Sequence, residues 1–226
     1  MTTISKEKPE GRVALRRQEL RRRLMAAGVD CFGSKGIDGT GMSELLSAAG
    51  TSPGAFYKLY DSKDVFVGAL IEAATNPVGD IIEAAGENSG DLVETIALGL
   101  RITLELARRY PGWGRFIAQT ALTSFAKQTG LGPRVSRDVV RAKQASEIDD
   151  EDDLLLVALV FGTFLSGVSA AGVGLLTPEM ILGLVERTLL GLGVSSDRAK
   201  ACVQSSTDNY VDTAVSEGRE LGIFTA

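Results

Sequence analysis

The sequence of 226 residues has no histidine, two cysteines and a single tryptophan. Without histidine, the chain lacks the commonest general base, the serine and cysteine triads that need one, and most zinc sites. The cysteines, Cys31 and Cys202, show no metal-ligand spacing, and Cys31 continues an apolar stripe that predicts a buried thiol. No secretory signal sequence opens the chain, and we therefore expect a cytoplasmic protein.

The sequence also shows no strand pattern and no internal repeat, whereas apolar residues recur at helical spacing. We therefore expect an all-α fold, with a small three-helix head on a larger helical body. Asn76-Pro77 is expected to kink or break the helix that joins the two parts. The expected helices cover residues 13–34, 42–49, 53–60, 62 onward, 91–110, 112–127, 133–148, 152–175, 178–192 and 196–215.

The net charge of −5 hides an asymmetry between the two ends of the chain. Residues 1–63 hold 11 Lys and Arg against 7 Asp and Glu, and the remainder holds 13 against 22. A basic front and an acidic body suit a protein that touches nucleic acid with one end, although such a division also aids solubility. The outward arginines of the first helix either contact phosphates or form a solvated face; they are Arg16, Arg17, Arg21, Arg22 and Arg23.

The segment from Thr40 to Lys63 contains the helix start and stop signals of a helix-turn-helix motif. Apolar residues at i, i+3, i+4 and i+7 place one stripe on a short helix over 42–49. Gly50 can take the left-handed conformation that ends this helix. Ser52 offers an oxygen to the free amides of the next helix, whose first turn accepts Pro53. The same turn also joins helices in small helical domains that bind no DNA.

The second helix of this segment has an unusually bare outer face, made by Gly54 and Ala55. Gly54 costs about 1 kcal/mol of helix propensity relative to alanine. Such a face suits a helix that must approach another backbone closely. Lys63 stands in the first turn of the following helix, where a cation opposes the helix dipole and gains from a nearby phosphate.

These residues resemble the DNA-binding domain of the tetracycline-repressor (TetR) family of bacterial transcription regulators. The resemblance covers about residues 18–70, and the rest of the chain is similar only in layout. Leu46 and Leu59 depart from the family pattern, and the second departure removes a side chain that often touches phosphate. The matching positions are Thr40, Leu45, Ala49, Gly50, Ser52, Gly54, Tyr57, Tyr60 and Lys63.

The resemblance implies a ligand-responsive regulator, most often a repressor, that binds a near-palindromic operator in double-stranded DNA as a homodimer. Residues 1–11 would form a flexible basic arm, 12–63 the helix-turn-helix domain and 64–226 the effector-binding and dimerisation domain. The side chains expected to hold phosphates are Thr40, Ser52, Tyr57 and Lys63. Those expected to face base edges are Pro53, Gly54, Ala55 and Lys58. Because the second set has few hydrogen-bonding groups, we expect DNA shape to carry part of the specificity.

Two apolar segments near the carboxyl end are the expected dimer interface, because in the family such helices pair with their copies in a four-helix bundle. Small residues recur every four positions on the first segment, and apolar residues recur at helical spacing on the second. Both stripes are also compatible with an intramolecular core. The expected interface residues are Ser166, Ala170, Gly174, Leu182, Val185 and Leu189.

A ligand pocket is expected between residues 112–127, the first of these apolar segments and the helix that links head to body. Its scarcity of charge predicts a small, uncharged or lipophilic effector, and we expect no cofactor. Aromatic residues at such spacing are also typical of a plain core. The expected lining is Trp113, Phe116, Ile117, Thr120, Phe161, Phe164, Leu165 and Val168.

Two other functions are compatible with parts of the sequence. The run from Leu154 to Leu176 has no charged residue and is long enough to span a membrane, although half of it is small or polar. The acidic cluster over 149–153 is the one dense group of carboxylates in which a helical-bundle enzyme could hold a metal, or else it caps a helix.

Overall fold

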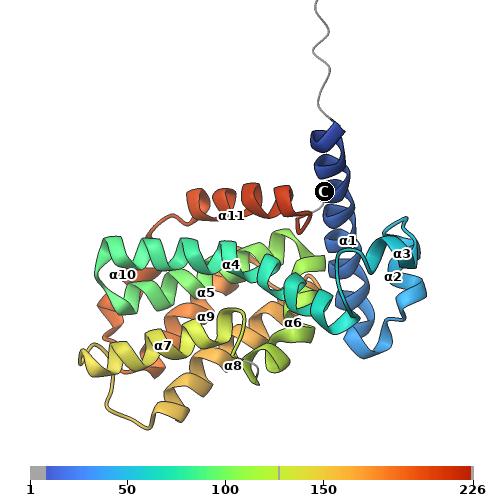
Figure 1. Cartoon of the computed structure of the whole chain (residues 1–226). Helices are drawn as coiled ribbons and strands as arrows, with labels where there is room; N and C mark the ends of the chain where they lie inside the picture. Colours follow the sequence, from blue (N-terminus) through green and yellow to red (C-terminus); the bar gives the residue numbers. More distant parts are fainter. Residues whose placement is uncertain (1–8, 127, 225–226) are drawn as a thin grey trace, which may run out of the picture.

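The computed structural model describes residues 9–126 and 128–224, so most of the expected arm lies outside the described residues (Figure 1). Within these ranges the chain forms eleven helices and no strand. A small head of α1, α2, α3 and the start of α4 stands at one end of a larger body built from the remaining helices. The expected all-α architecture of a helix-turn-helix head on a helical body is confirmed.

The first helix, α1 (Pro9–Gly39), is longer than expected at both ends. It begins at a proline, which fits the first helical turn because no amide donor is needed there. Residues 9–11, expected to belong to the arm, are therefore helical. At Gly36, two residues after the expected end of this helix, the backbone leaves the helical region with φ 75° and ψ 170°, and one more turn follows it.

Two short helices, α2 (Met42–Ala48) and α3 (Pro53–Phe56), complete the head. Gly50 has φ +59° in the turn between them, and the Ser52 hydroxyl accepts the amide of Ala55 at 3.3 Å, as the sequence predicts. The helix expected over 53–60 ends at Phe56. Buried Phe56 and Tyr60 pack on Phe66 with ring centroids 5.0–5.6 Å apart, so the chain after α3 is drawn into the head's core.

The helix that joins head and body, α4 (Lys63–Ser89), runs through Pro77 without ending, so the expected break was wrong. Ser62 caps its start by accepting the amide of Val65 at 3.2 Å. Near the proline, the Trp113 indole donates a hydrogen bond to the Ala74 carbonyl at 3.0 Å, and this bond helps to stabilise the backbone of that turn. A continuous α4 ties the position of the head directly to the body.

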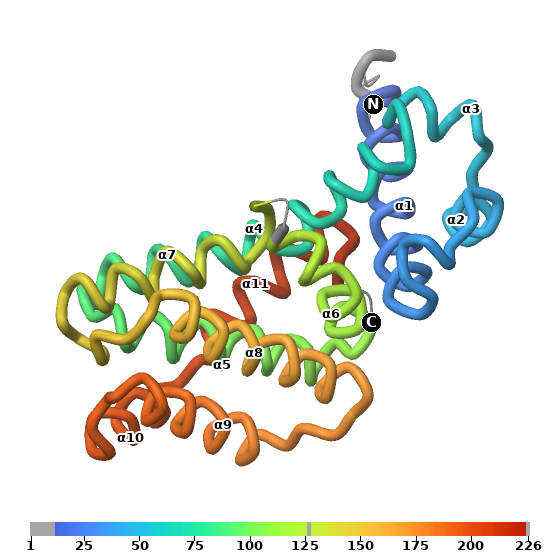
Figure 2. The backbone as a smooth tube through the Cα atoms, turned by 90° about the horizontal axis from the view of Figure 1, so that it is seen from below, coloured from blue at the N-terminus to red at the C-terminus, as the bar shows by residue number. Residues whose placement is uncertain are grey.

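The body surrounds α5 (Leu92–Arg109), whose residues are mostly buried and which packs against its neighbours on several sides. Figure 2 shows α7 lying beside α4, with α8 and α9 forming the opposite layer. The helix expected over 133–148 begins two residues earlier and ends four residues earlier. The helix expected over 196–215 is split into α10 and α11. The other body helices are α6 (Pro111–Ala126), α7 (Leu131–Gln144), α8 (Asp153–Gly172), α9 (Pro178–Gly191), α10 (Ser196–Gln204) and α11 (Asp208–Leu221).

A buried arginine explains the split between α10 and α11. The Arg101 guanidinium donates to the Cys202 carbonyl at 3.3 Å and to the Ser205 hydroxyl at 3.1 Å, and it also reaches the Ser205 carbonyl. Burial lowers the pKa of Arg101. These bonds fix the chain where α10 ends, and α11 then returns across α4 to the middle of α1.

Candidate nucleic-acid interface and ligand pocket

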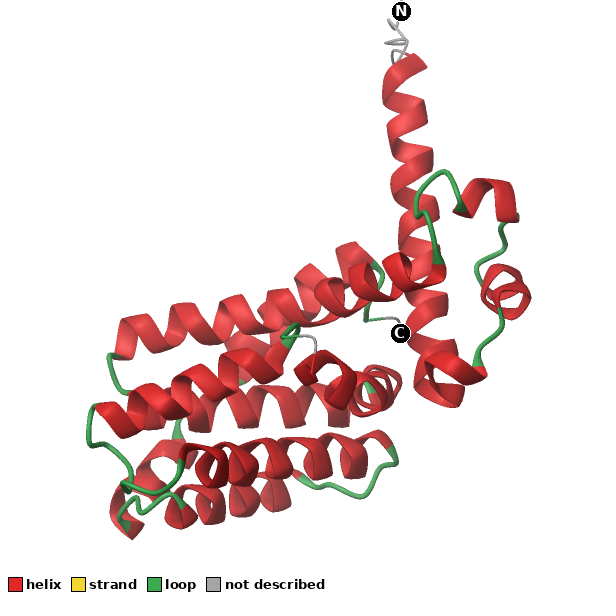
Figure 3. Cartoon of the chain, turned by 60° about the horizontal axis from the view of Figure 1, so that its bottom comes forward, coloured by secondary structure: helices red, strands yellow, loops and turns green. Residues whose placement is uncertain are grey.

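The face of α3 is open to solvent on the side of the head that points away from the body (Figure 3). Nothing lies within 4 Å of a side chain placed at Gly54. Another backbone can therefore come close to this helix, as the bare sequence predicts. The residues expected to contact DNA that are exposed here are Ser52, Pro53, Gly54, Tyr57 and Lys58, and Ala55 is partly exposed.

Thr40 does not belong to this face, so its expected contact with phosphate is not supported. The residue is 1% exposed, and its hydroxyl donates to the Gly36 carbonyl at 2.8 Å and the Cys31 carbonyl at 3.2 Å. Gly36 lies in the last turn of α1, where carbonyls have no partner within the helix, and Cys31 lies just over one turn earlier. Thr40 thus holds the end of α1 together.

Lys63 also has a partner inside the head. Its ammonium donates to the Ile37 carbonyl at 2.5 Å and to the Thr40 carbonyl at 2.7 Å, and it lies 5.7 Å from the centre of the Phe32 ring. Two of its three donors are therefore used to close the end of α1. The sequence predicted a phosphate contact because the lysine stands at a helix start, but the carbonyls that it meets come from another helix.

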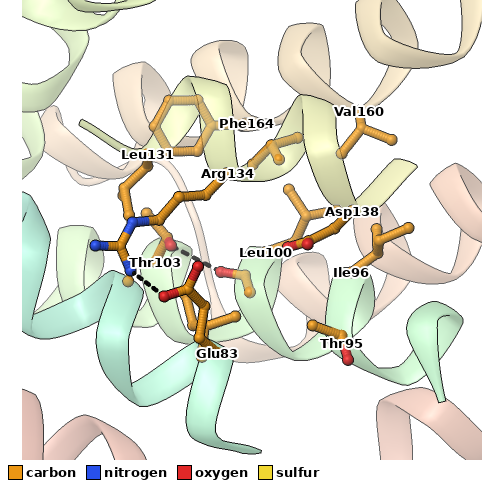
Figure 4. Close-up of a pocket in the computed structure, with 14 residues that line it drawn as sticks. Glu83, Thr95, Ile96, Leu100, Thr103, Leu131, Arg134, Asp138, Val160 and Phe164 are labelled. Atoms are coloured by element: carbon orange, nitrogen blue, oxygen red, sulfur yellow. Dashed lines mark hydrogen bonds and ion pairs between the residues drawn. The ribbon is translucent and has the colours of Figure 1, made fainter. Parts of the chain in front are cut away.

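A pocket lies in the body between α4, α5, α7 and α8 (Figure 4). Its walls are mainly apolar, with Leu100, Leu131, Val160 and Phe164 among them. Polar groups enter from α5 through Thr95 and Thr103, whose hydroxyls donate to carbonyls one turn earlier at 2.8 and 2.7 Å. An apolar cavity with a few convergent polar groups is typical of a small-molecule site.

The carboxyl group of Asp138, on α7, is the most buried acid at this pocket, since the residue is 7% exposed. Burial raises its pKa, although an ion pair with Arg137 at 3.1 Å opposes the shift. Nearby, Arg134 donates to Glu83 at 2.9 Å and to Asp80 at 2.8 Å, both on α4. One wall of the pocket is therefore a charged clamp between α7 and α4, as Figure 4 shows for Arg134 and Glu83.

The pocket differs from the one expected from the sequence, because Phe164 is its single predicted lining residue. Ile117, Thr120, Phe161 and Phe164 line a separate, smaller cavity. The remaining expected residues line neither cavity: Trp113, Phe116 and Val168 are buried in the core and Leu165 is half-buried. The smaller cavity has no charged lining residue, as the sequence predicts, whereas Asp138, Glu83 and Arg134 line the larger pocket.

A sequence signal for the larger pocket does exist. Thr95, Gly99 and Thr103 recur every four residues on α5, so they form one small and polar stripe on a buried helix. Buried polar groups need partners and mark places where a core does something other than pack. The stripe contains no aromatic residue, so a prediction from aromatic spacing does not include it.

The expected dimer stripes are divided between the core and the surface. Val185 and Leu189 are fully buried within the chain, so their assignment to an interface was wrong. Gly174 lies beyond the end of α8, in a left-handed turn with φ +76°. Ser166 and Leu182 remain exposed, and Ala170 is half-buried. The other large apolar side chains exposed on α8 and α9 are Leu154, Leu155, Leu159, Met180 and Leu190.

Two helices, α4 and α8, are long and apolar enough to cross a membrane by length and composition. Both pack against other helices of the body, and α8 contacts α5, α6, α7 and α9. In the acidic cluster that precedes α8, Asp152 accepts the amide of Leu154 at 2.9 Å, and Asp153 pairs with Lys143 at 2.8 Å. Within the described ranges, no group of three or more potential ligand side chains could hold a metal ion.

Comparison with protein families gives two matches in consecutive parts of the chain. Residues 24–70 match bacterial regulatory proteins of the tetR family, which covers the head and the start of α4. Residues 91–204 match the tetracyclin repressor-like C-terminal domain, which covers the body from α5 to α10. No curated protein sequence matches the chain significantly.

Solved structures share the whole fold at low sequence identity. RolR in complex with resorcinol has a TM-score of 0.60 at 23% identity, over 85% of this chain and 97% of that protein. A gamma-butyrolactone receptor, described as ArpA-like, has a TM-score of 0.60 at 17% identity, over 91% and 99%. CprB, a TetR family protein from S. coelicolor A3(2), has a TM-score of 0.59 at 16% identity, also over 91% and 99%.

Proposed function

The chain belongs to the tetR family of bacterial regulatory proteins, and on this premise we propose that it is a repressor that acts as a homodimer and responds to a small molecule. The proposal of DNA binding is supported by the exposed helix α3 on a basic head, because Gly54 leaves its outer face without a side chain. Such a regulator works on chromosomal DNA, in the cytoplasm.

In this proposal α3 of each head enters the major groove, and the two heads contact half-sites about 34–36 Å apart. Ser52 and Tyr57 hold phosphates, which fix the register of the protein on the duplex. Lys58 bonds guanine, and Ala55 contacts a thymine methyl group. Pro53 and Gly54 bring the helix close to the bases without adding hydrogen bonds, so DNA deformability supplies part of the specificity.

The test is a selection of binding duplexes from a random library, followed by titration of the selected duplex. Tyr57→Ala should weaken binding at least tenfold, because it removes a phosphate contact beside the reading helix. Tyr210→Ala is the matched control, since Tyr210 is also partly exposed but lies on α11. Failure to select any duplex, or equal loss in both variants, would argue against α3 as the DNA-binding helix.

The homodimer forms through the exposed apolar face of α8 and α9 in this proposal. A face with several exposed leucines and no acidic or basic residue on α8 between Leu154 and Gly172 is costly to leave in water. Pairing with the same face of a second copy produces a four-helix bundle with an isologous interface. Leu155→Glu should convert the dimer to monomer, whereas Leu122→Glu, an equally exposed leucine on α6, should not. Sedimentation equilibrium distinguishes these results.

The proposed effector is a small, uncharged aromatic molecule that carries hydroxyl groups. The pocket supports this class because its apolar walls fit an aromatic ring and the Asp138 carboxylate accepts a hydrogen bond from a hydroxyl. The structural relative RolR was solved with resorcinol, a molecule of this kind. Calorimetry with resorcinol and related phenols is the test. Asp138→Asn should weaken binding, and Asp197→Asn, which changes an exposed acid on α10 outside the pocket, should leave it unchanged.

The effector acts on DNA binding through α4. Arg134 reaches from the pocket wall on α7 to Glu83 and Asp80 on α4, and α4 continues into the head. A ligand that favours one arrangement of this clamp shifts the population of head positions, with a coupling of about 1–3 kcal/mol. Linkage requires DNA to weaken the effector by the same factor. Calorimetry that finds identical effector affinity with and without DNA would rule out this coupling.

A further inference from the structure

The first half of α1 is a strongly basic and fully exposed helical segment. Every residue from Arg12 to Glu19 is exposed. Figures 1 and 3 show this part of α1 projecting beyond the other helices of the head. From Arg12 to Arg23 there are six arginines and one acid, Glu19. Positive charge concentrated on a projecting helix is suited to a polyanion, and the head that carries it is the DNA-binding part in the proposed function.

One contact shows which way the arginines face. The Arg23 guanidinium donates to the Gly50 carbonyl at 3.2 Å, in the turn between α2 and α3. Arg16 and Arg12 precede Arg23 by seven and eleven residues, which is close to two and three full turns, so all three share one face. This face lies on the side of the reading helix. Arg22 faces α11 instead, since a side chain at Gly222 would come within 2.7 Å of its Cγ.

The direction of the helix decides which DNA it can reach. The projecting half of α1 lies on the opposite side of the molecule from α8 and α9 (Figure 1). In a dimer formed through α8 and α9, the two projecting helices point away from the two-fold axis, outward along the duplex. Residues 9–18 extend about 15 Å at 1.5 Å per residue, which corresponds to about four base pairs.

We propose that Arg12 and Arg16 bind backbone phosphates of the DNA that flanks each half-site, on the outer side. The two helices then clamp the duplex beyond the sequence that α3 reads, and the site needed for full affinity is about four base pairs longer at each end. Phosphate contacts position the protein without reading bases, so the flanking sequence itself is free. This inference rests on the proposed function of α3.

The test uses the duplex selected with the wild-type protein, prepared in two lengths. One ends at the outer edges of the two half-sites, and the other keeps about five further base pairs at each end. The wild type should bind the longer duplex more tightly and with a steeper salt dependence. The double variant Arg12→Gln/Arg16→Gln should bind both duplexes alike, with its slope on the longer one reduced by about 2 per head. Polarisation titrations over a range of salt concentrations give both quantities.

Two control variants separate the contact from other effects. Arg22→Gln removes the same charge from the face that meets α11, and it should keep the preference for the longer duplex. Arg12→Lys/Arg16→Lys keeps the charges and should restore most of that preference. Equal affinity of the wild type for the two lengths would overturn the inference, as would an equal loss on both lengths in the double variant. Failure of the proposed function is distinct, since then no duplex would be selected at all.

Discussion

Replacing Lys63 tests the largest change that the structure makes to the expected DNA interface. The ammonium donates to two carbonyls at the end of α1, at 2.5 and 2.7 Å, and the residue is half-buried. Hydrogen bonds from charged groups contribute about 1.5–3 kcal/mol each, and partial exposure lowers that figure. Lys63→Ala should therefore reduce the free energy of unfolding by about 2 kcal/mol in total, and the melting temperature by about 4–8 °C.

The matched control is Lys58→Ala. Lys58 is exposed, follows α3 directly and belongs to the residues proposed to contact DNA. Its replacement should change stability by less than about 0.5 kcal/mol, since it is a surface substitution. It should also weaken binding to the selected duplex and lower the salt slope by about 1 per head.

Urea denaturation followed by circular dichroism measures the stability of both variants, and polarisation titrations measure their DNA binding. DNA binding of Lys63→Ala should be measured well below its melting temperature, where the head is folded. A stable Lys63→Ala variant with a salt slope lowered by 1 would refute the structural role, because it would mean that the lysine leaves the carbonyls and binds phosphate.

Four other substitutions test particular contacts. In urea denaturation, Gly193→Ala should lose about 3 kcal/mol of stability and Gly174→Ala about 1 kcal/mol. Both glycines have a left-handed φ, but a side chain at position 193 would also clash with the Asp149 carboxyl group at 2.1 Å. Equal losses in the two variants would contradict this. Burial raises the pKa of Asp138, so its contribution to stability is present below the ordinary pKa of an aspartate and is lost as pH rises through the raised value. Asp138→Asn should therefore flatten the stability profile over that range, and an unchanged profile would show that the carboxyl group is not responsible. Asp91 has the opposite shift, because hydrogen bonds to its carboxylate outweigh burial and lower its pKa. Asp91→Ala should therefore reduce the free energy of unfolding by about 1 kcal/mol at neutral pH. This loss should vanish as pH falls through the lowered pKa.

The parts of the head whose structure depends on residues adjacent in the sequence were predictable from the sequence. Gly50, Ser52 and Pro53 specify a left-handed turn, a cap and a first turn in succession, and each does so through its own backbone preference. The bare face of α3 was predictable in the same way, because Gly54 has no side chain whatever the fold. The residues matched to the tetR family lie in this part of the chain, so the family was also identifiable there.

The partners of polar side chains were decided by the tertiary structure. Thr40 and Lys63 stand where the sequence predicts phosphate contacts, but both meet carbonyls from the end of α1. Those carbonyls lie in the last turn of α1 or just after it, where carbonyls have no partner within the helix, and the sequence does not reveal which distant side chain will satisfy them. Pro77 is a similar case, since packing of α4 against the body outweighs the local cost of a proline inside a helix.

The same distinction between local and tertiary determinants applies to the body. Periodicity determined that α8 and α9 have apolar stripes, but an apolar stripe is equally suited to a core and to a partner chain. Only the packed structure shows that Val185 and Leu189 are buried within the chain while Leu155 and Leu190 remain outside. The pocket likewise needs Thr103 from α5 and Asp138 from α7 to line one cavity. The sequence by itself determined the helices, the turn and the basic head, because these depend on local geometry and composition; the ligand pocket and the exposed apolar face depend on how helices distant in sequence pack together.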